Sequence, residues 1–76
     1  MDEKIKAMLY DIQPSYDFDT SSDFIEDGYL DSFDVVTLVA DLEEEFSVLI
    51  SALDILPENF SSIATIGALV KKSEKI

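Results

Sequence analysis

The strongest constraint on the fold is an apolar stripe that repeats at helical spacing in the middle of the chain. Between residues 32 and 46, hydrophobic side chains recur at intervals of three and four, the pattern of a helix with one buried face. They are Val35, Leu38, Val39, Leu42 and Phe46. Asp31 directly precedes this segment and is a good N-cap residue. We therefore expect a helix from about Ser32 to Phe46.

A second helix and a long connection are predicted before this stripe. Residues 3–12 carry apolar residues at helical spacing, and Pro14 disfavours helical geometry at its end. Residues 14–31 are rich in Ser, Asp and Thr, with an Asp27-Gly28 turn signal. Apolar residues scattered through this connection indicate that it is held against the helices. They are Tyr16, Phe18, Phe24, Ile25, Tyr29 and Leu30.

The last third of the chain predicts one short and one longer helix. Pro57 suits the start of a short helical turn that reaches Phe60. Ser61 or Ser62 can cap a final helix, whose last turn holds a Lys71-Lys72 pair that complements the helix dipole. The sequence therefore predicts one domain, residues 1–76. We expect an all-α fold, a small four-helix bundle (three major helices and one short) with a long first loop.

The charge of the chain limits its partners. Seventeen acidic residues oppose five basic ones, which gives a formal net charge of −12. Such a chain repels phosphate backbones and anionic lipids, so nucleic acids and membrane surfaces are poor partner candidates. A protein with a basic patch is the natural partner, because opposite charge speeds the encounter.

Missing residue types exclude several kinds of chemistry. The chain has no Cys and no His, so it cannot form a disulfide, a thiolate nucleophile or a Ser-His-Asp arrangement. The Asp17–Ser21 segment is similar to the start of a calcium loop, but Ser22 and Gly28 stand where an EF-hand needs Gly and Glu. A hydrolase with paired carboxylates such as Glu26 and Asp31 would need a pocket that so small a chain does not evidently offer. We expect neither an enzyme nor a metal site.

The ends and the apolar runs of the chain bear on its location. The Met-Asp-Glu-Lys start lacks the apolar stretch of a signal peptide, and no apolar run approaches the length of a membrane span. We therefore expect a cytoplasmic protein, and a monomer.

Ser32 stands where an attached anion would be stabilised. It follows a turn and opens the best-patterned helix, where backbone N–H groups and the positive end of the helix dipole converge. A phosphodiester is such an anion. Phe33, Val36 and Ala40 form a short apolar line beside Ser32 that the core stripe does not require. The acidic residues expected to border this line are Asp34, Asp41 and Glu44.

These features resemble the acyl carrier protein family. Asp31-Ser32 is followed by an apolar residue, and the helix that it opens ends in Leu42-Glu43-Glu44-Glu45-Phe46. The family's helix reads Asp-Ser-Leu and continues into Leu-Glu-Glu-Glu-Phe, and the resemblance covers essentially the whole chain. The segment Gly28–Phe33 is closer to stand-alone carriers of specialised pathways, including D-alanyl and peptidyl carriers.

The resemblance implies a function and a site. Ser32 would accept 4′-phosphopantetheine from coenzyme A through a phosphopantetheinyl transferase that uses magnesium, and Asp31 would assist recognition by that transferase. The arm's thiol would carry an acyl or aminoacyl thioester, loaded by a ligase and passed to synthase or transferase enzymes of fatty-acid or secondary-metabolite biosynthesis. Partners would meet one face of the helix, formed by Phe33, Val36, Ala40, Asp41 and Glu44.

An alternative remains open from the residues alone. An acidic helical interaction module without a prosthetic group would show the same size, charge and helix pattern. Ser32 would then only begin a helix, Asp31 would only cap it, and Phe33 and Val36 would belong to the core of a differently packed bundle. Tyr29 and Phe60 are candidates for flanking a prosthetic arm, with structural packing as their alternative role.

Overall fold

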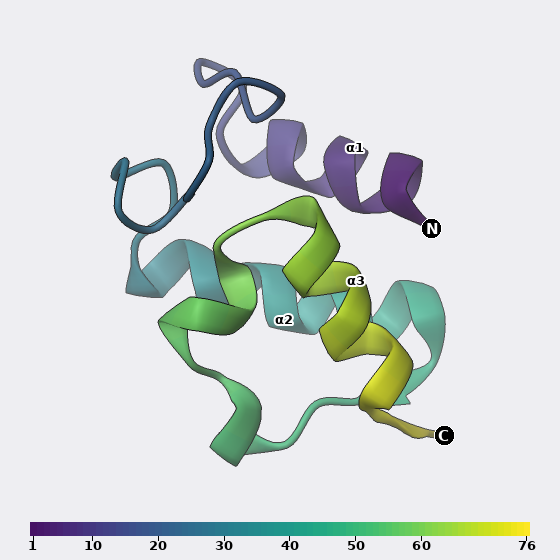
Figure 1. Ribbon diagram of the computed structural model, residues 1–76. Helices are drawn as coiled ribbons and strands as arrows, with labels where there is room; N and C mark the ends of the chain where they lie inside the picture. The colour runs from purple at the N-terminus through teal and green to yellow at the C-terminus, as the bar shows by residue number, and fades with distance from the viewer.

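Three α-helices form the frame of the protein, in a computed structural model that describes residues 1–76. They are α1 (Asp2–Ile12), α2 (Ser32–Phe46) and α3 (Ile63–Lys72). α1 packs against both α2 and α3, and the long first loop joins α1 to α2 at one end of the bundle (Figure 1). The predicted helical bundle is confirmed, and only the start of α1 differs from the sequence-based range, by one residue.

The core contains fifteen buried hydrophobic side chains from all three helices and from the segments between them. The predicted stripe of α2 supplies Val35, Leu38, Val39 and Leu42, whereas Phe46 at its end is only half-buried. Among the largest fully buried side chains, Phe18 and Phe24 come from the first loop and Phe60 from the short helical turn. The loop is therefore part of the core, as its apolar residues indicated.

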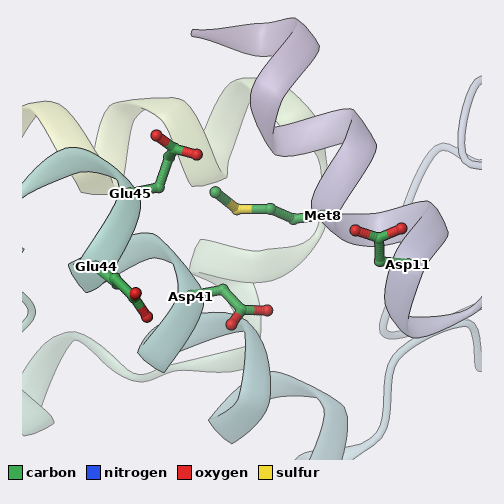
Figure 2. Close-up of a pocket in the computed structure, with 5 residues that line it drawn as sticks. All are labelled: Met8, Asp11, Asp41, Glu44 and Glu45. Atoms are coloured by element: carbon green, nitrogen blue, oxygen red, sulfur yellow. The ribbon is translucent and has the colours of Figure 1, made fainter.

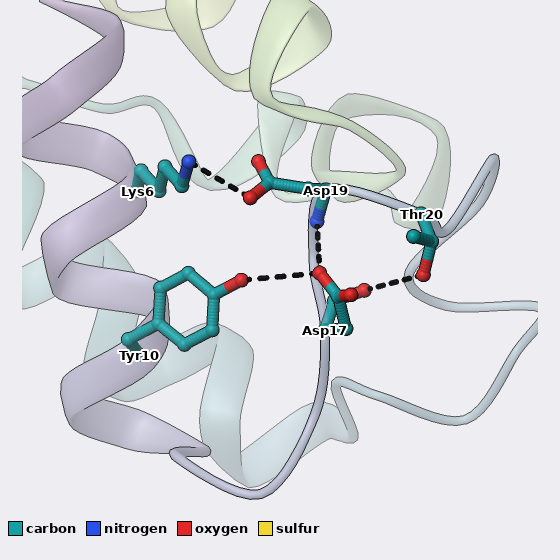
Figure 3. Close-up of polar contacts among 5 residues, drawn as sticks. All are labelled: Lys6, Tyr10, Asp17, Asp19 and Thr20. Carbon is teal, nitrogen blue, oxygen red and sulfur yellow. Dashed lines mark hydrogen bonds and ion pairs between the residues drawn. The ribbon is translucent and has the colours of Figure 1, made fainter.

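Backbone and side-chain contacts fix the course of the first loop. The N–H of Phe24 donates to the carbonyl of Ser61 at 2.8 Å, which ties the loop to the start of α3. Gly28 has φ +75, so the predicted Asp27-Gly28 turn uses the left-handed conformation that glycine adopts without strain. Lys6 and Tyr10 on α1 reach Asp19 and Asp17 of the loop (Figure 3). These contacts tie the loop to α1 and to the residues before α3.

The segment between α2 and α3 holds two short helical turns. They are 3₁₀ helices, η1 (Ala52–Asp54) and η2 (Pro57–Phe60). η2 has proline at its first position and is the short helix predicted from the sequence. Ser62 caps α3 and accepts a hydrogen bond from the N–H of Thr65 at 3.1 Å.

A small antiparallel ribbon was not predicted. It pairs β1 (Val48–Leu49) with β2 (Glu74–Lys75), in the register Val48 with Lys75 and Leu49 with Glu74. Ser47 joins α2 to β1 in the left-handed conformation (φ 53), which turns the chain sharply after the helix. The N–H of Ile76 donates to the carbonyl of Ser47 at 2.9 Å, so the last residues lie against the end of α2.

Candidate functional site

A capping box fixes the start of α2. Oδ1 of Asp31 accepts a hydrogen bond from the N–H of Asp34 at 2.8 Å, and Oδ2 of Asp34 accepts one from the N–H of Asp31 at 3.3 Å. The two bonds satisfy two N–H groups that a helix start would otherwise leave unpaired. The predicted N-cap role of Asp31 is confirmed.

Ser32 occupies the first position of the helix and is exposed. Because Asp31 caps the helix, the hydroxyl of Ser32 is not needed for capping, and it makes no hydrogen bond to another part of the chain. Its Oγ is therefore available to an incoming reagent, at the end of the helix where the dipole favours negative charge.

An apolar cavity of about 380 Å³ opens beside Ser32. Its walls come from the end of the first loop, from the first turns of α2 and from the segment that leads into η2. The lining residues are Ile25, Leu30, Asp31, Ser32, Val35, Val36, Ile55, Leu56 and Pro57. The sequence did not predict that residues of the loop and of η2 line this cavity, because only the tertiary fold brings them next to Ser32. Leu56 was the one local signal, an apolar residue directly before the turn predicted to start at Pro57.

The apolar line beside Ser32 faces solvent. Phe33 is 78% exposed and Val36 is 65% exposed, and Ala40 is exposed as well. Apolar side chains that lie together on an exposed face can mark an interaction site. The alternative that Phe33 and Val36 belong to the core is wrong.

The prediction that Asp34 borders this apolar line is wrong. The sequence pattern placed it on the solvent side of α2, but the residue is only 8% exposed and its side chain is turned toward α1. There its Oδ2 accepts a hydrogen bond from Nε2 of Gln13 at 2.9 Å. Asp34 is therefore a buried structural carboxylate and does not border the exposed face.

The three consecutive glutamates at the end of α2 have different surroundings. Glu43 accepts a hydrogen bond from the N–H of Ile50 at 2.9 Å, which fixes the chain after the helix. Glu45 pairs with Lys4 at 3.4 Å. Glu44 is exposed and has no hydrogen-bond or ion-pair partner within the chain. Of the three, Glu44 is the carboxylate left free for another molecule.

Asp41 lies at the edge of the exposed face, on the side toward α1. It is half-buried and lines a groove of about 430 Å³ between α1 and α2, together with Met8, Asp11, Glu44 and Glu45 (Figure 2). Of the residues expected on the partner side, Phe33, Val36 and Ala40 share one exposed face with Glu44. Asp41 lies between that face and the groove.

Tyr29 and Phe60 are packing residues. Phe60 is fully buried, and the ring of Tyr29 stacks on Tyr16 with centroids 4.5 Å apart and an interplanar angle of 5°. Neither residue lines the cavity beside Ser32.

The positive charge of the chain is confined to its two ends. All five basic residues lie within the first six or the last six positions, at Lys4, Lys6, Lys71, Lys72 and Lys75. Residues 7–70, which include all of α2 and the cavity, contain no basic residue. The lining of the cavity beside Ser32 therefore holds one charged residue, Asp31, and no basic one.

A helical bundle with an exposed, unengaged serine at a helix start and an apolar cavity beside it offers a place where a group can be attached covalently. The family model for the phosphopantetheine attachment site matches residues 7–71. The chain belongs to this family, whose members are carriers with covalently attached 4′-phosphopantetheine. Comparisons with curated proteins and with solved structures return no significant match.

The residues around Ser32 fit 4′-phosphopantetheine. The free hydroxyl at the first position of α2 suits a phosphodiester, which the helix dipole stabilises. The cavity volume of about 380 Å³ lies within the range of about 300–1,000 Å³ that small-molecule sites occupy.

None of the three α-helices combines the length and the apolar content that crossing a bilayer requires.

Proposed function

We propose that the chain is a single carrier domain, residues 1–76, that holds an acyl or aminoacyl group as a thioester on 4′-phosphopantetheine attached to Ser32. The observation that carries this proposal is the exposed Ser32, whose hydroxyl is unengaged by the chain and which lines an apolar cavity. The protein acts as a cytoplasmic monomer, and its partners perform the chemistry.

Loading begins with the transfer of the group from coenzyme A. The Oγ of Ser32 forms a bond to the phosphorus next to the pantetheine, and the phosphoanhydride bond of coenzyme A breaks. The adenosine bisphosphate leaves, and the hydroxyl proton passes to a base on the transferase. The bound group supplies a terminal thiol, which this chain lacks because it has no Cys.

Asp31 contributes to recognition by the transferase while it caps the helix. Only its Oδ1 is used for capping, by the N–H of Asp34. Its Oδ2 accepts no hydrogen bond from the chain and lies one residue from Ser32. A transferase that uses magnesium can therefore approach this oxygen without opening the cap, since carboxylate oxygens are ligands that this ion prefers.

The exposed face of α2 receives the partner enzymes. Phe33 and Val36 offer apolar contact, and Glu44 adds a carboxylate with no internal partner. Asp41 extends the negative charge toward α1. A transferase, a loading ligase and downstream synthase or transferase enzymes would each dock through a basic rim around an apolar centre, because opposite charge steers the encounter and apolar burial holds it.

Intact-protein mass spectrometry tests the proposal. The purified chain is incubated with coenzyme A, magnesium and a broad-specificity phosphopantetheinyl transferase. We expect one phosphopantetheine per chain, mapped to Ser32 by peptide fragmentation, and no adduct on Ser32→Ala with an unchanged circular dichroism spectrum. Ser22→Ala, which removes an exposed serine of the first loop, serves as the matched control and should be modified normally. Absence of an adduct with several transferases would contradict the proposal.

A further inference from the structure

Asp34 is the one charged residue that is buried in the protein, with 8% of the residue exposed. Its Oδ2 accepts two hydrogen bonds from different parts of the chain. One comes from Nε2 of Gln13 at 2.9 Å, and the other from the backbone N–H of Asp31 at 3.3 Å. A single carboxylate oxygen therefore joins the end of α1 to the residue before Ser32.

The burial of this carboxylate is not needed for helix capping. A capping-box side chain at the third position of a helix can act at the surface, where water solvates its charge. Burial of a carboxylate is costly unless donors replace that water. Gln13 provides such a donor from the C-cap position of α1, where its own N–H is held by the carbonyl of Leu9 at 2.9 Å. The arrangement therefore fixes the orientation of α2 at its start relative to the end of α1.

We propose that Asp34 and Gln13 are positioning residues for the modification of Ser32. Neither side chain touches the reacting groups, because Asp34 is buried and Gln13 reaches only Asp34. They act through Asp31, whose backbone N–H is held by Asp34 and whose carboxylate is held by the N–H of Asp34. The contact keeps Ser32 and the free oxygen of Asp31 in one orientation before the transferase arrives. This inference rests on the proposed attachment at Ser32.

A charge-conserving swap tests the contact between Gln13 and Asp34. Gln13→Glu places two carboxylates against each other and breaks the contact, because like charges at this distance repel. The double variant Gln13→Glu with Asp34→Asn again pairs one amide with one carboxylate, with their positions exchanged. It also restores the net charge. Ser15→Glu adds the same charge at an exposed position of the loop. Ser62→Ala removes the other capping box, that of α3.

The readout is the kinetics of phosphopantetheine transfer with saturating coenzyme A, at a temperature where circular dichroism shows every variant folded. For Gln13→Glu we expect kcat to fall by about ten- to a hundredfold, the range expected when one hydrogen bond to a charged group is lost. The KM for the carrier chain should stay within about twofold, since the exposed face of α2 that meets the transferase is unaltered. The double variant should recover most of kcat. Ser15→Glu and Ser62→Ala should behave like the wild type.

Three outcomes would overturn the inference. The first is an unchanged kcat in Gln13→Glu. The second is a loss in Gln13→Glu that the double variant does not repair. The third is a loss of the same size in Ser62→Ala, which would mean that helix stability alone determines the rate. In each case the proposed function would stand as long as the wild type is modified and Ser32→Ala is not. An unmodified wild type would instead contradict both the proposed function and this inference.

Discussion

Nζ of Lys6 lies 2.8 Å from Oδ2 of Asp19, so an ion pair joins α1 to the middle of the first loop (Figure 3). The hydrogen bond to Asp19 raises the pKa of Lys6 above its ordinary value of 10.5, against a smaller opposing effect of desolvation. The neighbouring Tyr10 and Asp17 add to the increase. The cation is thus retained at higher pH in the folded chain than in the unfolded chain.

The first prediction is a loss of stability at alkaline pH that depends on this pair. A pKa raised by folding contributes stability that is complete below the unfolded value and is lost as the pH rises through the folded value. Melting curves above pH 10.5 should therefore show a steeper fall for the wild type than for Asp19→Asn. An NMR titration of the Lys6 side chain should give a higher pKa in the wild type. Identical titrations in the two proteins would contradict the prediction.

The second prediction concerns the two glycines, which should respond to alanine in opposite directions. Gly67 lies inside α3, and a methyl group there would be 3.6 Å from Sδ of Met1, an ordinary van der Waals distance. Gly67→Ala should raise the free energy of unfolding by up to about 1 kcal/mol, from helix propensity. Gly28→Ala should lower it by about 1 kcal/mol because φ is +75. Urea unfolding curves measure both, and a destabilised Gly67→Ala would show that α1 needs a closer approach to α3.

The third prediction separates the two kinds of contact on the exposed face of α2. Glu44→Lys should slow association with the transferase on the order of tenfold at low salt, and the effect should shrink at high salt because screening weakens steering. Val36→Arg should weaken binding at any salt, since it replaces apolar contact with a charge that must be desolvated. Stopped-flow and steady-state kinetics at two ionic strengths distinguish the salt-dependent effect of Glu44→Lys from the salt-independent effect of Val36→Arg.

A matched control for this face is available on α3. Ala68 is exposed there, so Ala68→Arg introduces the same new side chain away from α2. It should bind the transferase as tightly as the wild type does. If Val36→Arg and Glu44→Lys also retained normal kinetics, recognition would lie outside this face, most simply in the first loop.

The fourth prediction follows from the net charge of −12. Repulsion among carboxylates opposes the compact state, and added salt screens it. Sodium chloride should therefore raise Tm by several degrees, although it weakens the three exposed ion pairs of the chain. Glu26→Gln removes one exposed charge of the loop, so it should raise Tm at low salt and reduce the salt response. A Tm independent of ionic strength would show that the repulsion is already dispersed.

The parts of the fold that could be predicted are those whose signal is local. The stripe of α2 predicts a buried face from spacing alone, and Asp31, Pro57 and the pair Ser61-Ser62 mark helix starts by their chemistry, with Ser62 the actual cap. The β1–β2 ribbon was missed because a strand of two residues shows no period. Its pairing depends on where α3 ends, which only the packed structure determines.

The site could be predicted in part for the same reason. Ser32 and its exposed apolar neighbours follow from helix position, whereas the cavity needs Ile55 and Leu56, which the fold brings from beyond α2. The prediction that Asp34 faces solvent was wrong because helical periodicity shows only that Asp34 lies away from the apolar stripe of α2. It does not show that Gln13, 21 residues away, offers a donor on that side.

The division of roles between Asp31 and Ser32 has a consequence for the attachment of a group at Ser32, the site proposed above. Had Ser32 capped α2 itself, esterification of its hydroxyl would have removed a cap, and loss of a cap costs about 1 kcal/mol. Because the cap belongs to Asp31, a substituent on Ser32 leaves the helix start intact. Attachment of a group at Ser32 therefore does not cost the bundle its α2 cap, in the empty or in the loaded form.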